Sequence, residues 1–93
     1  MHVGTITLRL VLHEVHSLKE KRQIVQSVID TTHRRFNVAI AEVGDLDLWQ
    51  SALLGVAAVS NDARHLNSLL DNVTDFLERS PDFDVSAADI ELF

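Results

Sequence analysis

Two histidines and a carboxylate stand close together in the sequence at His13, Glu14 and His16. Neutral imidazole and carboxylate groups are common zinc ligands, so this cluster is the first place to look for metal chemistry. The zinc-protease motif places its two histidines four residues apart on one helix face, whereas these are three apart, and the chain has no cysteine to complete a site. We therefore predict that the chain binds no metal and uses no cofactor.

Ser17 is the next candidate for chemistry, as a nucleophile. It stands three residues before Glu20, the spacing of a reciprocal helix cap, and a serine cap stabilises a helix by about 1 kcal/mol. No glycine-rich loop beside Ser17 supplies the backbone donors that an oxyanion needs. We assign no catalytic residue and expect a non-enzymatic protein, with an enzyme of unrecognised mechanism as an alternative.

Positive charge is concentrated in residues 16–38, although the whole chain has a formal net charge of -6. When the residues of this segment are placed at 100° intervals around a helix, four basic residues fall on or beside its polar arc. We call these four residues the basic ridge: Lys19, Arg22, His33 and Arg34. The basic ridge is predicted to contact an anionic partner, and the alternative is an ordinary solvated helix face.

Two further cations, Lys21 and Arg35, lie nearer the apolar arc of the same predicted helix. We expect their aliphatic stems to cover the edge of the core while their charges reach water. The second predicted helix carries three acidic residues on its outer arc, Asp71, Asp75 and Glu78. The two helices are therefore expected to present fields of opposite sign.

Trp49 is the only tryptophan and lies in the connection between two predicted strands. One interpretation is that it covers one end of the core. The other is that it anchors a protein partner, because tryptophan is over-represented in the energetically dominant parts of interfaces. Asp45 and Asp47 in the same connection are expected to be solvated turn residues.

Hydrophobic periodicity predicts the elements that must hold these residues. Alternating apolar residues predict a strand over 2–13, and a 3.6-residue period predicts a helix from Ser17 to Phe36, which Asn37 ends in a left-handed conformation. Two more strands, over 38–43 and 51–60, flank a connection that is too short for a crossover helix. These two strands are expected to pair antiparallel.

The C-terminal third adds one helix and one strand. Leucine, valine and phenylalanine at helical spacing predict a helix over about 62–79, because Pro81 prevents its continuation. The segment 83–92 is predicted to be a strand in which the apolar residues switch from one alternating phase to the other. A bulge near Ala87 and Ala88 would account for that change.

The predicted order is strand, helix, strand, strand, helix, strand, over one domain of residues 1–93. Right-handed crossovers then place both helices on one face of a four-stranded antiparallel sheet, so we predict a ferredoxin-like α+β sandwich. RNA-recognition motifs of this architecture stack bases on aromatic residues of the first and third strands, and neither strand here has one. That mode of RNA binding is not expected.

The strand over 51–60 is apolar in both of its phases, as strands are when both sheet faces are covered. Two helices cover one face only, so a homodimer is predicted, and tolerated exposure of small alanine and glycine side chains is the competing explanation. No stretch is long and apolar enough to span a membrane, and the N-terminal residues lack the pattern of a secretion signal. A cytoplasmic location without a membrane partner is expected.

Four segments in order, "VGTITLRL", "HSLKEKR", "RRFNVAIAEV" and "DLWQSALLGVAAVS", resemble the YlxP-like family of small bacterial proteins of unknown function (DUF503). The resemblance covers nearly the whole chain and implies a ferredoxin-like fold and a bacterial cytoplasmic setting. It brings no catalytic residues.

Genes of this family often lie beside those for translation initiation factor two and ribosome-binding factor A. The resemblance therefore implies a role in translation or ribosome maturation, with ribosomal RNA or a translation factor as the partner. The alternative is a dimeric ligand-binding regulatory domain, although the first loop lacks a glycine that would let a ligand approach the backbone.

Overall fold

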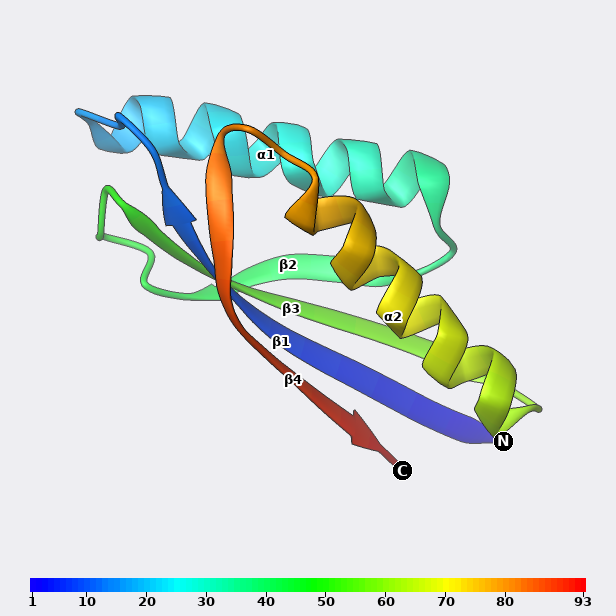
Figure 1. Ribbon diagram of the computed structural model, residues 1–93. Coiled ribbons are helices and arrows are strands. Elements are labelled where there is room, and N and C mark those ends of the chain that lie inside the picture. The colour runs from blue at the N-terminus through cyan, green and yellow to red at the C-terminus, as the bar shows by residue number, and fades with distance from the viewer.

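The computed structural model describes all residues from Met1 to Phe93 and contains six elements. In chain order they are β1 (His2–Leu12), α1 (Leu18–Arg35), β2 (Ala39–Gly44), β3 (Ser51–Ser60), α2 (Ala63–Glu78) and β4 (Phe83–Leu92). The strands form one antiparallel sheet in the order β2-β3-β1-β4, and both helices lie against the same face of it (Figure 1). The predicted ferredoxin-like α+β fold is confirmed.

The core lies between the sheet and α2. Ile6, Leu8 and Leu10 on the inward phase of β1 are fully buried, and α2 buries Leu66 and Leu70 against them among others. The close approach of α2 to β1 depends on Gly4. A Cβ atom at Gly4 would lie 2.8 Å from Leu70 Cδ1, so this position leaves no room for a side chain.

Helix α1 begins at the predicted cap but is less deeply buried than α2. Ser17 Oγ accepts a hydrogen bond from the Glu20 backbone N–H at 3.1 Å. In return, Glu20 Oε2 accepts from the His16 backbone N–H, one residue before the cap, also at 3.1 Å. Only three residues of α1 are buried, namely Lys21, Val25 and Thr32.

The end of α1 differs from the prediction, because Asn37 does not adopt a left-handed conformation. The helix ends at Arg35, and Phe36 is extended with φ −129° and ψ 144°. The Phe36 ring packs edge-to-face on the Phe76 ring of α2, with centroids 5.6 Å apart. This contact holds Phe36 against α2 where the chain leaves the helix, so no residue with positive φ is required.

The bulge predicted in β4 exists, but it lies at Ser86 rather than at Ala87 and Ala88. Arg9 pairs with Ala87 while Leu10 pairs with Val85, which leaves Ser86 unpaired. The extra residue restores the phase, since apolar residues on both sides of it then face the helices. As a result, Phe83 belongs to the core and Ile90 packs against it.

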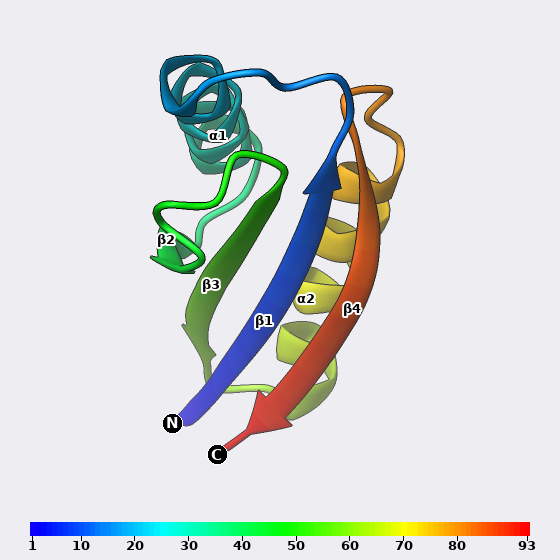
Figure 2. The same cartoon turned by 90° about the vertical axis from the view of Figure 1, so that its left-hand side faces the viewer.

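The sheet face away from the helices is uncovered, and Figure 2 looks onto it with α2 behind the strands. We call it the open face. Its apolar members on β2 and β3 are Ala39, Ala41, Val43, Leu53, Gly55, Ala57 and Val59. Val43 and Val59 keep 57% and 62% of their surface exposed. Neither helix is long and apolar enough to cross a membrane.

Candidate functional site

The basic ridge lies where the sequence placed it. Lys19, Arg22, His33 and Arg34 are all exposed on the side of α1 that faces away from the sheet. None of the four makes an ion pair with a carboxylate. The one acidic residue within this surface, Asp30, accepts a hydrogen bond from Gln26 Nε2 at 2.9 Å. The ridge therefore presents cations that the fold itself does not neutralise.

The acidic residues of α2 are exposed as well. Asp71, Asp75 and Glu78 face solvent along that helix, and Asn67 Nδ2 donates to Asp71 Oδ2 at 3.3 Å. Charges farther apart than about 8 Å are largely screened at physiological salt. An anionic partner in contact with α1 would thus be attracted by the ridge despite the net charge of the chain.

Lys21 does not reach water, so that expectation was wrong. Its side chain is 0% exposed, and Nζ lies 2.9 Å from Glu42 Oε2 on β2. Nζ also donates a hydrogen bond to the backbone carbonyl of Asp45. The approach of Nζ to Glu42 Oε2 falls outside hydrogen-bond geometry, and no other partner satisfies that buried oxygen. The contact is therefore mainly an electrostatic pair under α1.

Asp45 is not a solvated turn residue either. Its φ is 58°, in the left-handed region that aspartate tolerates better than most residues. Its Oδ2 atom accepts from Arg9 Nη1 and from Ser51 Oγ, each at 2.7 Å. These bonds hold the side chain at 20% exposure. Asp47 is exposed, as predicted.

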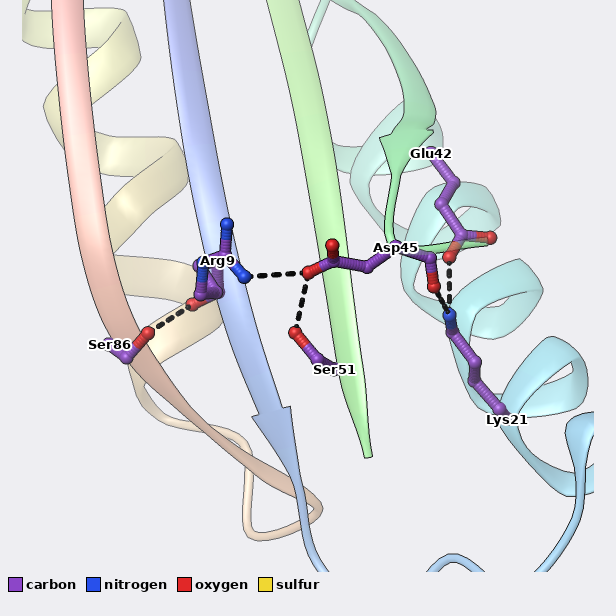
Figure 3. Close-up of polar contacts among 6 residues, drawn as sticks. All are labelled: Arg9, Lys21, Glu42, Asp45, Ser51 and Ser86. Atoms are coloured by element: carbon purple, nitrogen blue, oxygen red, sulfur yellow. Dashed lines mark hydrogen bonds and ion pairs between the residues drawn. The ribbon is translucent and has the colours of Figure 1, made fainter. Parts of the chain in front are cut away.

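These contacts join into one polar network, which we define as Arg9, Lys21, Glu42, Asp45 and Ser51 (Figure 3). The network runs from the open face, where Arg9 lies on β1, to the underside of α1. Ser86 in the bulge of β4 extends it by donating to the Arg9 backbone carbonyl at 3.5 Å. Ser51 Oγ donates to Asp45 Oδ2, but the same oxygen is paired with Arg9, so this carboxylate is engaged as a structural acceptor. The network holds the β2–β3 connection against α1.

Trp49 does not cover an end of the core, so the first interpretation was wrong. It is 50% exposed and lies outside the core cluster. It lines a shallow hollow with Val11, Leu48 and Ser51, which extends the open face into the β2–β3 connection. Leu46 and Leu48 beside it are also about half exposed. The anchoring role of Trp49 stays a prediction, now with an exposed apolar surface around it.

His13 binds oxygen atoms from the start of β4 and from the loop before it. Its Nε2 donates to Asp84 Oδ2 at 3.0 Å and its Nδ1 lies 3.2 Å from the Pro81 carbonyl oxygen. The hydrogen bond to Asp84, followed by that to Pro81, raises the pKa of His13 above its ordinary value of 6.5. No group of three or more histidine, cysteine or acidic side chains gathers into a metal-binding arrangement.

Sequence reasoning missed the polar network, although a signal for it was present. Glu42 stands in the same inward phase as Val38 and Ile40, and Lys21 stands near the apolar arc of the helix that covers that strand. Opposite charges on the inward faces of two neighbouring elements indicate a buried pair. The bonds of Asp45 carried no such signal, because they depend on the path of the connection.

Comparison with known proteins supports the resemblance noted above. A family model described as "Protein of unknown function (DUF503)" matches residues 3–90. The chain is also similar to a protein of Bacillus subtilis (strain 168) named "Uncharacterized protein YlxP". The two are 30% identical over 91 residues, which is 98% of this chain and 99% of that protein. Neither description names a ligand, a partner or a reaction.

Proposed function

The chain belongs to the DUF503 family of unknown function, and we propose that it is a non-enzymatic binding module whose basic ridge contacts RNA in a ribosomal particle. The observation that carries the proposal is a row of three exposed cations, Lys19, Arg22 and Arg34, together with His33, none of which has an acidic partner. From Lys19 to His33 the row extends about 21 Å along the helix at the usual rise of 1.5 Å per residue. A polyanion such as an RNA backbone can meet several of these charges at once.

The absence of a catalytic arrangement around the histidines, Ser17 or the polar network favours binding over catalysis. Ser17 Oγ is engaged as the helix cap, and the two buried charges of the network pair with each other. The ribosomal setting rests on the gene neighbourhood that the family resemblance implies. A free translation factor is the competing partner, and the experiment distinguishes the two.

The test measures binding of the full chain to purified ribosomal particles as salt is increased. Binding of the parent should be modest at low salt and should fall with a log–log slope of about −2 to −3, as expected when three or four phosphates are contacted. The double variant Lys19→Glu, Arg22→Glu should abolish it. A matched charge reversal on α2, Arg64→Glu with Arg79→Glu, changes the net charge equally and should leave binding within about twofold of the parent.

Two results contradict the proposal. The first is a parent chain that does not sediment with ribosomal particles at low salt. The second is a ridge variant that binds as well as the parent, which would leave the ridge as a solvated helix face. Binding to a purified translation factor but not to particles would assign the ridge to a protein partner.

We further propose that the open face is covered by a second copy of the chain. The face is apolar across β2 and β3 and carries no charged residue there. With three strands, β2, β3 and β1, about 4.8 Å apart and ten residues of β3 at about 3.3 Å each, the contact would measure about 14 by 33 Å, a planar area of about 470 Å² at the small end for a protein–protein interface.

A two-fold axis along β3 suits the charges of the sheet. This axis would stack β3 on its copy and place the two β4 strands at opposite outer sides of the dimer. On the open face, β4 carries the acidic residues Asp84, Asp89 and Glu91. The β4 strands would then be about 19 Å apart, beyond the screening length of about 8 Å. Strand β3 would meet its copy, and β2 would meet β1, whose open-face charge on Arg9 is already paired with Asp45.

A further inference from the structure

A cavity of about 330 Å³ opens between α1 and α2 on the helix side of the sheet, away from both the basic ridge and the open face. It exists because the two helices diverge from their contact at Phe36 and Phe76, so that the side of α1 facing α2 is only partly covered. Its apolar lining consists of Val28, Phe76, Leu77 and Phe83. Ligand sites in proteins have volumes from about 300 Å³, so one small molecule fits this space.

Two guanidinium groups stand at the cavity, from Arg35 on α1 and Arg79 at the C-cap of α2. Arg35 is held in place by aromatic rings, since its Cζ lies 5.0 Å from the Phe76 centroid and 5.9 Å from the Phe36 centroid. Neither arginine has a carboxylate within ion-pair distance, although Asp82 also lines the cavity. The cavity therefore combines an apolar wall with two cations that the protein leaves unpaired.

Hydroxyl groups from both sides add hydrogen-bonding capacity. Ser80 Oγ accepts from the Asp82 backbone N–H at 3.2 Å, which leaves its own proton free to donate. Ser27 lines the opposite side from α1. Thr31 Oγ1 already donates to the Ser27 carbonyl at 2.7 Å and accepts from Arg34 Nη2 at 3.4 Å, so it adds little further capacity.

From this combination we propose that the cavity binds a small organic anion, with its carboxylate or phosphate between Arg35 and Arg79 and its apolar body against Val28, Phe76 and Phe83. Guanidinium groups bind such anions through charge-assisted hydrogen bonds. The aromatic wall selects a ligand with a ring or an aliphatic chain over a bare inorganic anion. This site uses none of the four ridge residues, although Arg34 of the ridge donates a hydrogen bond to Thr31 in its lining at 3.4 Å.

The test is a titration of the ¹⁵N-labelled full chain with 3-phenylpropionate, followed by backbone amide shifts, and the same titration with the neutral amide 3-phenylpropanamide. We expect saturable shifts at Ser27, Thr31, Ser80 and Asp82, and an affinity at least about tenfold weaker for the neutral probe. Arg79→Gln and Arg35→Gln should each weaken binding of the carboxylate by about tenfold. Arg79→Gln serves as the cleaner variant, since Arg79 does not stack on a ring.

Arg22→Gln is the matched control, because it removes one cation from the ridge and touches no residue that lines the cavity. This variant should leave the affinity for 3-phenylpropionate unchanged and should weaken binding to ribosomal particles. Arg35→Gln should weaken the affinity for 3-phenylpropionate and leave binding to particles unchanged. The proposal is overturned if the shifts gather on β2 and β3, if the carboxylate and its amide bind equally, or if no saturable shift occurs. If the cavity binds 3-phenylpropionate but the ridge variants bind ribosomal particles as well as the parent does, the cavity site is supported and the proposed role of the ridge is rejected.

Discussion

Lys21 and Glu42 form an ion pair of 2.9 Å beneath α1, with the lysine side chain wholly shielded from water. Taking two charges out of water costs several kcal/mol, and their mutual attraction repays that cost only while both are present. The pair thus fixes α1 over β2, and its partner Asp45 joins the β2–β3 connection to the same point.

Lys21→Met should destabilise the chain by about 3 kcal/mol, because it leaves Glu42 buried without a counter-charge. Thermal unfolding should show a loss of at least about 10 °C in Tm. Adding Glu42→Leu should recover most of that loss. Lys19→Met, an exposed lysine on the same helix, should change stability by less than about 0.5 kcal/mol. An unchanged Tm for Lys21→Met would mean that the lysine is not paired inside the fold.

Gly4→Ala should cost about 1–3 kcal/mol in urea unfolding, because the new Cβ would lie 2.8 Å from Leu70 Cδ1 in the closely packed core. Gly55→Ala offers a comparison with a similar clash, 2.9 Å from Val43 Cγ1. In the single chain Val43 is more than half exposed and can move, so at concentrations where the chain is monomeric we expect at most about 0.5 kcal/mol there. Equal losses at both glycines would contradict the burial argument.

His13 should make stability depend on pH near neutrality. Both of its nitrogens face oxygen atoms, so both hydrogen bonds form only when the imidazole is protonated, and the folded-state pKa exceeds 6.5. The stabilisation is complete below the unfolded pKa and is lost as pH rises through the higher folded pKa. His13→Gln should remove this loss in urea titrations, whereas His16→Gln should keep it. An NMR titration placing the His13 pKa at or below 6.5 would refute the assignment.

Val43→Asp should separate the proposed dimer, because it places a charge within an apolar interface, one strand away from the axis along β3. Light scattering at high micromolar concentration should give about twice 10.4 kDa for the parent and about 10.4 kDa for the variant. Ser68→Asp adds the same charge on the exposed side of α2 and should leave the dimer intact. A parent chain that scatters as a monomer would show that the open face is not closed by a second copy.

Local patterns were sufficient to predict the order of elements and most of their bounds. The strand over Ile6 to Leu12 and the helix start at Ser17 each depend on residues only a few positions apart in the sequence. The structure agrees with both predictions. Antiparallel pairing of β2 with β3 followed from the short connection alone.

Contacts between distant residues explain the errors. The conformation at Phe36 depends on the Phe76 ring forty residues later, and the inward position of Lys21 depends on Glu42. The exposure of Trp49 depends on how Asp45 is tied to Arg9 and Lys21. The ridge could be predicted because exposure on a helix follows from spacing, whereas the cavity between α1 and α2 depends on the angle at which the helices diverge.

The bulge at Ser86 also protects the molecule from polymerising along its strands. Unpaired backbone groups on an outermost strand can template the addition of another chain, which leads to aggregation. β4 is the longer of the two outermost strands, and its bulge together with its acidic side chains prevents a flat, regular edge. β2 at the opposite edge is only six residues long and has its own irregularity at Val43. Both outer edges of the sheet are thereby poor templates for fibre-like addition of strands from other copies.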